Sequence, residues 1–102
     1  MYRYQFHLQV RMGHWRDFQA LVDELNAALQ AKGLVPFQLW EAAFGRLNDA
    51  LMVAEYGSLD AYEREHLAFH ADAVCMDLWR AIGQHTDTTQ WTDLWWRPSG
   101  AV

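Results

Sequence analysis

Residues 2–12 read YRYQFHLQVRM, and apolar and polar side chains alternate along this stretch. Successive side chains of a β-strand point to opposite faces, so a period of two predicts a strand with one apolar and one polar face. The polar face consists of Arg3, Gln5, His7, Gln9 and Arg11. Burial of apolar surface is favourable, so other parts of the chain are expected to pack against the apolar face.

An amphipathic helix is predicted directly after this strand. Gly13 interrupts the alternation, and from Trp15 to Leu29 the apolar residues recur at steps of three and four, the spacing of one helix face. Gly33 marks the predicted end of the helix, because glycine suits the left-handed conformation that often follows a helix.

Two further strands form a predicted hairpin in the middle of the chain. Pro36 precedes a strand at residues 37–44, and a turn at residues 45–49 leads into a strand at residues 50–56. The hairpin therefore adds two antiparallel strands to the first one.

The last third of the chain predicts a second helix and a final strand. Ser58 suits the N-cap of this helix, whose apolar pattern continues to Trp79 with a bend near Asp72. A polar connection at residues 85–90 leads to a strand at residues 91–96, which is rich in tryptophan.

The resulting order of elements, β-α-β-β-α-β, is the split βαβ arrangement of ferredoxin-like folds. In this α+β fold a four-stranded antiparallel sheet carries both helices on one face. We expect one such domain over residues 1–102, since a chain of 102 residues suits a single core. The other face of the sheet also carries apolar residues from three strands, so a second copy of the chain is expected to cover it in a homodimer.

Composition and charge limit the partners. The formal charge of −5 disfavours nucleic acid and anionic membranes. No apolar run approaches the roughly 20 residues that cross a bilayer, and residues 1–5 lack the apolar core of a signal peptide, so a cytoplasmic location is expected.

Cys75 is interpreted as a small buried hydrophobe. The 15% aromatic content exceeds the needs of a minimal core, which indicates an interface or a pocket.

The predicted hairpin and the residues after it resemble the NIPSNAP family of the dimeric α+β-barrel superfamily. The residues that carry the resemblance are Gly45, Leu47, Asn48, Tyr56, Ser58 and Leu59. This resemblance implies a homodimer whose two sheets face each other and close a barrel. Other branches of the superfamily are similar to small monooxygenases, cyclases and isomerases that act on aromatic or polyketide-like compounds.

The polar face of the first strand is one candidate site. Gln5, Gln9 and Arg11 are candidate ligand-binding residues inside the barrel, and the imidazole of His7 is a candidate acid or base. The alternative is that these side chains form hydrogen bonds across the dimer or face solvent at a sheet edge.

Two glutamates and two histidines form a second candidate site. Glu41 and Glu55 lie on the two arms of the hairpin, and His66 and His70 on the second helix are possible partners in acid–base catalysis. The alternative is a pair of surface or structurally paired glutamates. The two histidines have the spacing for one metal ion, but no third ligand follows by spacing, so no metal site is predicted.

Two functions from different classes remain open at this point. The first is a cofactor-independent enzyme of the monooxygenase, cyclase or isomerase type that acts on an aromatic or polyketide-like substrate, with Trp40 and Trp95 as candidates for stacking against it. The second is a non-catalytic binding or protein-interaction module whose barrel is filled by its own side chains.

Overall fold

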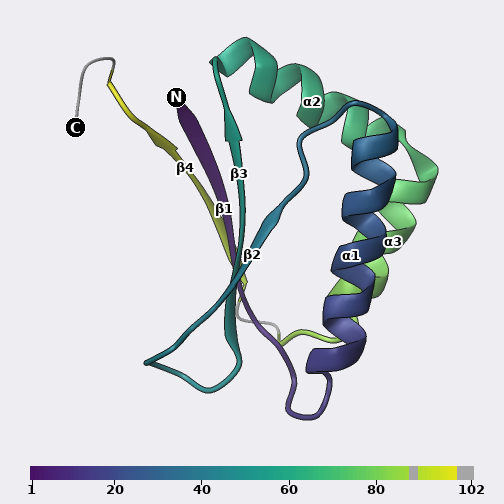
Figure 1. Cartoon of the computed structure of the whole chain (residues 1–102), viewed down its shortest axis with the longest axis vertical. Coiled ribbons are helices and arrows are strands. Elements are labelled where there is room, and N and C mark those ends of the chain that lie inside the picture. The colour runs from purple at the N-terminus through teal and green to yellow at the C-terminus, as the bar shows by residue number, and fades with distance from the viewer. Residues whose placement is uncertain (88–89, 99–102) are drawn as a thin grey trace.

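The computed structural model describes residues 1–87 and 90–98 (Figure 1). Along the chain the elements are β1 (Tyr2–Gln9), α1 (Trp15–Ala31), β2 (Gln38–Glu41), β3 (Asp49–Tyr56), α2 (Leu59–Ala71), α3 (Ala73–Gly83) and β4 (Trp91–Trp96). The predicted α+β order is confirmed, with the second helix divided into α2 and α3. Residues 88 and 89 of the predicted polar connection lie outside the described residues.

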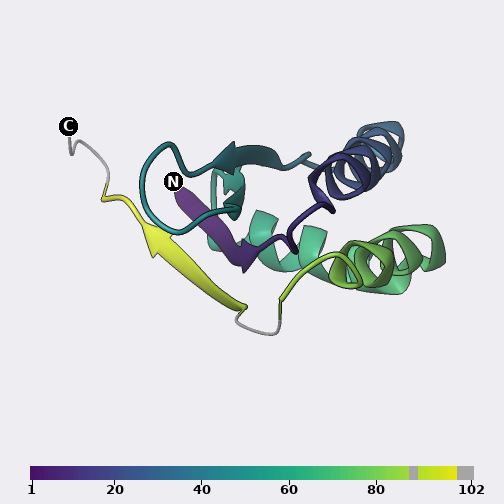
Figure 2. The ribbon, with the colours of Figure 1, turned by 90° about the horizontal axis from the view of Figure 1, so that it is seen from below.

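The four strands form one antiparallel sheet in the order β2-β3-β1-β4. The helices lie on one side of this sheet (Figure 2). Residues directly opposite each other in antiparallel strands point to the same face, so the register assigns every strand residue to a face. Phe6 is opposite Met52 and Thr92, and all three belong to the face that the helices cover.

The hydrophobic core lies between this face and α1 and α3. From the sheet it receives Leu8 and Met52, and from α1 it receives Phe18, Leu25 and Leu29, all of them buried. The apolar side of the period-two pattern in β1 therefore packs against the helices, as the alternation predicted. Cys75 is also buried in this core, as its apolar sequence context indicated.

Local interactions explain why some elements differ from their predicted bounds. β2 begins only at Gln38, because the Asn26 side chain binds both the N–H and the C=O of Phe37, each at 2.8 Å. The predicted bend near Asp72 is a complete break in the helix. The Asp72 backbone is extended, its carboxylate caps α3 by accepting from Cys75 N–H at 2.9 Å, and it also pairs with Lys32.

The second face of the sheet carries no helix among the described elements. On it lie Gln5 and His7 of β1, Trp40 of β2, and Trp91 and Trp95 of β4. All three tryptophans are more than half exposed. We refer to this surface as the open face; its coverage by a second copy of the chain remains a prediction.

The two faces of β1 predict opposite responses to substitution. Leu8→Ala should lower the free energy of unfolding by about 2–5 kcal/mol, because it leaves a cavity beneath the helices. His7→Ala should cost about 1 kcal/mol, since this half-buried ring loses one stacking contact and one hydrogen bond. Urea denaturation measures both values, and equal losses would show that the faces of β1 are wrongly assigned.

Candidate functional site

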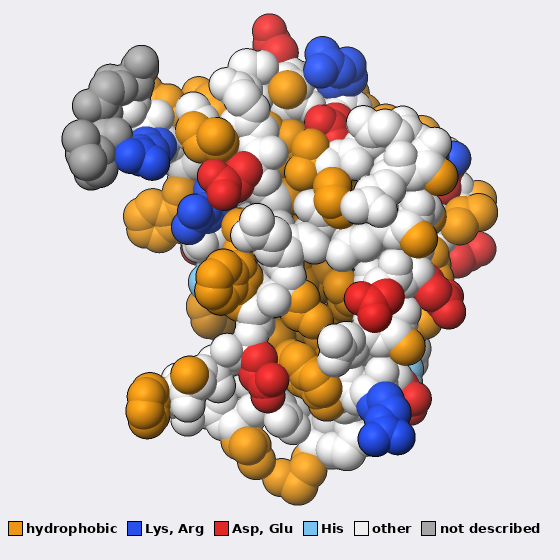
Figure 3. Space-filling model, in the orientation of Figure 1, with side chains coloured by type: hydrophobic (Ala, Val, Ile, Leu, Met, Phe, Trp, Pro, Cys, Tyr) orange, Lys and Arg blue, Asp and Glu red, His pale blue; other side chains and the backbone are white. Residues whose placement is uncertain are grey.

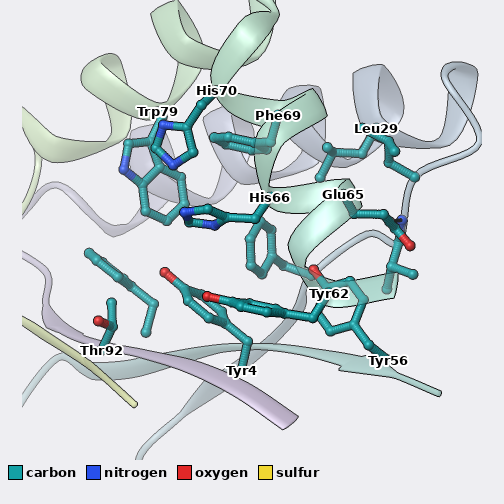
Figure 4. A pocket seen from close by; sticks show the side chains of 14 residues that line it. Tyr4, Leu29, Tyr56, Tyr62, Glu65, His66, Phe69, His70, Trp79 and Thr92 are labelled. Atoms are coloured by element: carbon teal, nitrogen blue, oxygen red, sulfur yellow. Dashed lines mark hydrogen bonds between the residues drawn. The ribbon is translucent and has the colours of Figure 1, made fainter. Parts of the chain in front are cut away.

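A cavity of about 180 Å³ lies between the sheet and the helices. Figure 4 shows the side chains that line it, and hydrophobic side chains are visible in the hollow between sheet and helices in Figure 3. The lining residues are Tyr4, Phe6, Leu29, Leu34, Val35, Phe37, Tyr56, Tyr62, Glu65, His66, Phe69, His70, Trp79 and Thr92. A cavity of about 150 Å³ is enough to hold a benzene ring.

The cavity exists because α2 does not pack tightly on the sheet. None of its 13 residues is buried, whereas α1 and α3 both contribute buried residues to the core. One side of α2 lines the cavity. It carries residues spaced four, three and one positions apart, namely Tyr62, His66, Phe69 and His70. The break at Asp72 separates α2 from α3 and thus lets the two helices take different paths.

Aromatic rings form the walls of the cavity. At its inner end Phe6 meets the edge of Trp79, with 4.9 Å between ring centroids, and Phe37 lies 5.8 Å from the same indole. Toward α2 the Tyr4 ring stacks on Tyr62 at 6.1 Å. The walls thus offer flat apolar surfaces suited to a planar ligand.

A stack of rings brings phenol and imidazole groups together. Tyr62 lies between Tyr4 and His66, with 5.5 Å between the Tyr62 and His66 ring centroids, and His70 lies 4.4 Å from His66. In Figure 4 the rings of Tyr4 and Tyr62 extend side by side below the imidazole of His66. Proton donors and a proton acceptor therefore meet at one end of the cavity.

Partial burial favours the uncharged forms of Tyr4 and Tyr56, and desolvation acts in the same direction on His66, although its side chain is exposed. Desolvation, followed by the neighbouring Tyr62 and Tyr56 phenols, raises the pKa of Tyr4 to about 12. Desolvation, followed by Glu65 and Tyr62, raises the pKa of Tyr56 to about 12 as well. The pKa of His66 is lowered from 6.5, mainly by desolvation and further by the charge of a protonated His70. At neutral pH the cavity presents protonated phenols beside a neutral imidazole.

The polar groups of Tyr4, Tyr62 and His66 are available for hydrogen bonds with a ligand. Within residues 1–87 and 90–98 the phenol oxygens of Tyr4 and Tyr62 and the nitrogens of His66 have no protein hydrogen-bond partner. In this part of the chain neither phenol oxygen is fully buried without a partner, and the His66 side chain is exposed, so these groups contact solvent. A bound ligand is able to take the place of that solvent.

Glu65 has a different role. Its Oε1 accepts a hydrogen bond from the backbone N–H of Val35 at 2.7 Å, which ties α2 to the segment between α1 and β2. Together with the double hydrogen bond between Asn26 and Phe37, this contact fixes the cavity wall formed by Leu34, Val35 and Phe37.

The structure separates the members of the predicted glutamate–histidine site. His66 and His70 line the cavity, but Glu41 and Glu55 do not. Glu55 lies on the open face and pairs with Arg3 at 3.5 Å, while Glu41 is exposed at the end of β2 and opposite Ala50. The predicted proximity of these glutamates to the two histidines is therefore wrong.

The reason lies in the register of the hairpin. Pairing of Glu41 with Ala50 places odd-numbered residues of β2 on the same face as even-numbered residues of β3. Glu41 and Glu55 thus belong to opposite faces. The acid that does line the cavity, Glu65, was not identified from the sequence, although its position three residues after Tyr62 and one before His66 places it on the same side of α2.

The polar row of β1 lies on the open face, away from the cavity. Asp93 of β4 accepts from Gln5 and contacts Nε2 of His7, both at 3.1 Å, and the His7 ring stacks on Trp91 at 4.4 Å. Gln9 donates to the carbonyl of Leu47 at 2.9 Å.

The remaining ligand-binding candidates are also outside the cavity. Arg11, just beyond β1, donates to the carbonyl of Thr86 at 3.1 Å. Trp40 and Trp95 lie with His7 on the open face, on the two outer strands of the sheet. A ligand-binding role for these residues remains a prediction about the interior of a dimeric barrel.

The described part of the chain contains neither a cluster of metal ligands nor a membrane-spanning helix. In residues 1–87 and 90–98, no three His, Cys, Asp or Glu side chains come close enough together to hold a metal ion. Among the helices of the same part of the chain, none combines the length and the hydrophobicity needed to span a bilayer.

Known structures share this fold at low sequence identity. A NIPSNAP domain protein from Burkholderia xenovorans aligns with a TM-score of 0.79 and 12% identity over 100% of this chain and 99% of that chain. A NIPSNAP family protein from Agrobacterium tumefaciens gives 0.77 and 16% over 98% and 88% of the two chains. An antibiotic biosynthesis monooxygenase gives 0.74 and 13% over 96% and 99%.

At the sequence level, no protein-family model and no curated protein matches the chain. The structural similarities establish the fold, and they agree with the NIPSNAP resemblance seen in the sequence.

The lowered pKa of His66 is open to a direct test. In an NMR titration its midpoint should lie below 6.5, and His70→Ala should raise it partway, because burial, the larger cause, remains. The unfolded chain binds this proton more tightly than the folded chain does, so the group lowers stability as the pH falls below about 6.5. The control is His14→Ala, which removes an imidazole outside the cavity and should leave the midpoint of His66 unchanged. A midpoint at or above 6.5 would contradict the proposed environment.

Proposed function

We propose that the chain is a small-molecule enzyme of the isomerase type, which binds a planar aromatic ketone or its enol in the sheet–helix cavity. One observation carries the proposal: the cavity combines a neutral imidazole with protonated phenols whose hydrogen bonds are open to a ligand. The aromatic walls supply stacking surfaces for the ring of the ligand.

His66 is the proposed general base. It takes a proton from the carbon next to the ligand carbonyl, so the C–H bond breaks and its electron pair moves toward the carbonyl oxygen. Its lowered pKa keeps the imidazole unprotonated and able to accept this proton at neutral pH. Return of the same proton to another atom of the ligand completes an isomerisation, and this step needs no cofactor.

Tyr4 and Tyr62 are the proposed donors to the developing oxyanion. Burial keeps the Tyr4 phenol protonated far above neutral pH, so it stays a hydrogen-bond donor while negative charge forms on the ligand. The stacking of Tyr62 between Tyr4 and His66 supports the placement of donors and base around one ligand. His70 is a weaker candidate for the base, because it lies farther along α2 from the two phenols.

Deuterium exchange tests the proposed chemistry without knowledge of the natural substrate. The protein should catalyse exchange into the methyl group of acetophenone in D₂O, followed by NMR. His66→Gln should lower the rate about 100-fold or more, as expected for loss of a general base. Tyr4→Phe should lower it about tenfold through loss of one hydrogen bond to a charged oxygen.

The control is His14→Gln, which alters a half-buried imidazole outside the cavity that contacts His85. This variant should leave the exchange rate unchanged. Equal rates for His66→Gln and the wild-type protein would rule out His66 as the base.

The proposed assembly is a homodimer in which the open faces of two sheets meet. Its support is the exposure of Trp40, Trp91 and Trp95 on that face, since exposed aromatic side chains gathered on one face are typical of interfaces. The Arg3–Glu55 pair on the same face offers polar contacts at the rim.

Sedimentation tests the dimer. The wild-type protein should sediment as a dimer at micromolar concentration, with about 1,000 Å² or more buried in total. Leu51→Asp places a charge in the middle of the open face, opposite His7, and should give a monomer. The matched variant Leu67→Asp alters an exposed leucine of α2 and should remain dimeric. A monomeric wild-type protein would refute the barrel.

A further inference from the structure

The helix-side face of β4 is only partly covered. Thr92, Leu94 and Trp96 point to this face because they are opposite Phe6, Tyr4 and Tyr2. Thr92 lines the cavity, but Leu94 is 38% exposed and Trp96 is 62% exposed. In Figure 1 the end of β4 diverges from α2, which begins just after β3 and extends away from β4.

This exposed surface continues directly from the cavity. Leu94 is the immediate cross-strand neighbour of Tyr4, a cavity residue, and side chains paired in this way lie about 5 Å apart. Two residues along the strands, Tyr2 of β1 lies between Trp96 of β4 and Tyr56 of β3, and Tyr56 also lines the cavity. We call Leu94 and Trp96 the ledge.

The cavity has room for about one aromatic ring, so any further rings of a ligand extend onto the ledge. The volume of about 180 Å³ accommodates one aromatic ring, since a cavity of about 150 Å³ is enough to hold benzene. Additional fused rings have to extend outward, and the path along β4 presents an aliphatic and an indole side chain that are both accessible. A flat hydrocarbon extension removes this apolar surface from water, which favours binding.

We infer that the ledge is a second subsite, which selects planar ligands of several fused rings over ligands of one ring. This inference rests on the proposed function, because it assumes that the first ring and the carbonyl occupy the cavity. Trp96 then acts as a specificity-determining residue that stacks on the distal rings, while His66 and the phenols act on the carbonyl end.

The test compares the affinities of acetophenone and 2-acetylanthracene, measured by calorimetry. The wild-type protein should bind the three-ring ketone more tightly. Trp96→Ala should weaken binding of 2-acetylanthracene about tenfold, a loss typical of one aromatic stacking contact with its buried area, and leave acetophenone unchanged. Trp91→Ala is the matched control, since Trp91 is 57% exposed on the same strand but points to the open face. It should change neither affinity.

The outcomes separate the two proposals. If the wild-type protein binds neither ketone, the proposed function and the ledge both fail. If it binds acetophenone but Trp96→Ala leaves the affinity for 2-acetylanthracene unchanged, the ledge alone is overturned. A change in the sedimentation of Trp96→Ala would also overturn the ledge, because it would show that a second copy of the chain covers Trp96.

Discussion

The central position of β1 is the constraint on which the rest of the structure depends. Because β1 pairs antiparallel with β3 on one side and with β4 on the other, its register assigns the residues of both neighbours to a face. The even-numbered side chains of β1 face the helices, where Leu8 joins the core and Tyr4 and Phe6 line the cavity. One alternating strand thus builds the core and one wall of the candidate site.

The cavity follows from a difference between the helices. α1 and α3 place buried side chains in the core, whereas α2 stands away from the sheet and turns tyrosine, histidine and phenylalanine toward the space that remains. Asp72 makes this possible, because its extended backbone ends α2 and its carboxylate begins α3. The side chains of Asn26 and Glu65 then hold the segment between α1 and β2 against this space through backbone hydrogen bonds.

The protonation states in the cavity follow from partial desolvation of its polar groups. Desolvation is the largest cause of the raised pKa values of Tyr4 and Tyr56 and of the lowered pKa of His66, so the same burial favours the neutral form of acid and base alike. Neutral donors and a neutral acceptor suit proton transfer with an uncharged ligand. The open face differs, since its imidazole, His7, already contacts the Asp93 carboxylate and the Trp91 ring.

Local patterns in the sequence determined the α+β order, the face of β1 that packs in the core, and the cap at Ser58, whose side chain accepts from Ala61 N–H. These features depend on residues near one another in the chain, and the spacing of their apolar side chains can be recognised in the sequence alone. Tertiary structure alone decided that Glu41 and Glu55 lie on opposite faces, because the pairing register across the hairpin sets this relation. It also decided that Glu65 and His66 of α2 meet Tyr4 of β1, since residues so far apart in sequence come together only when helix and sheet pack.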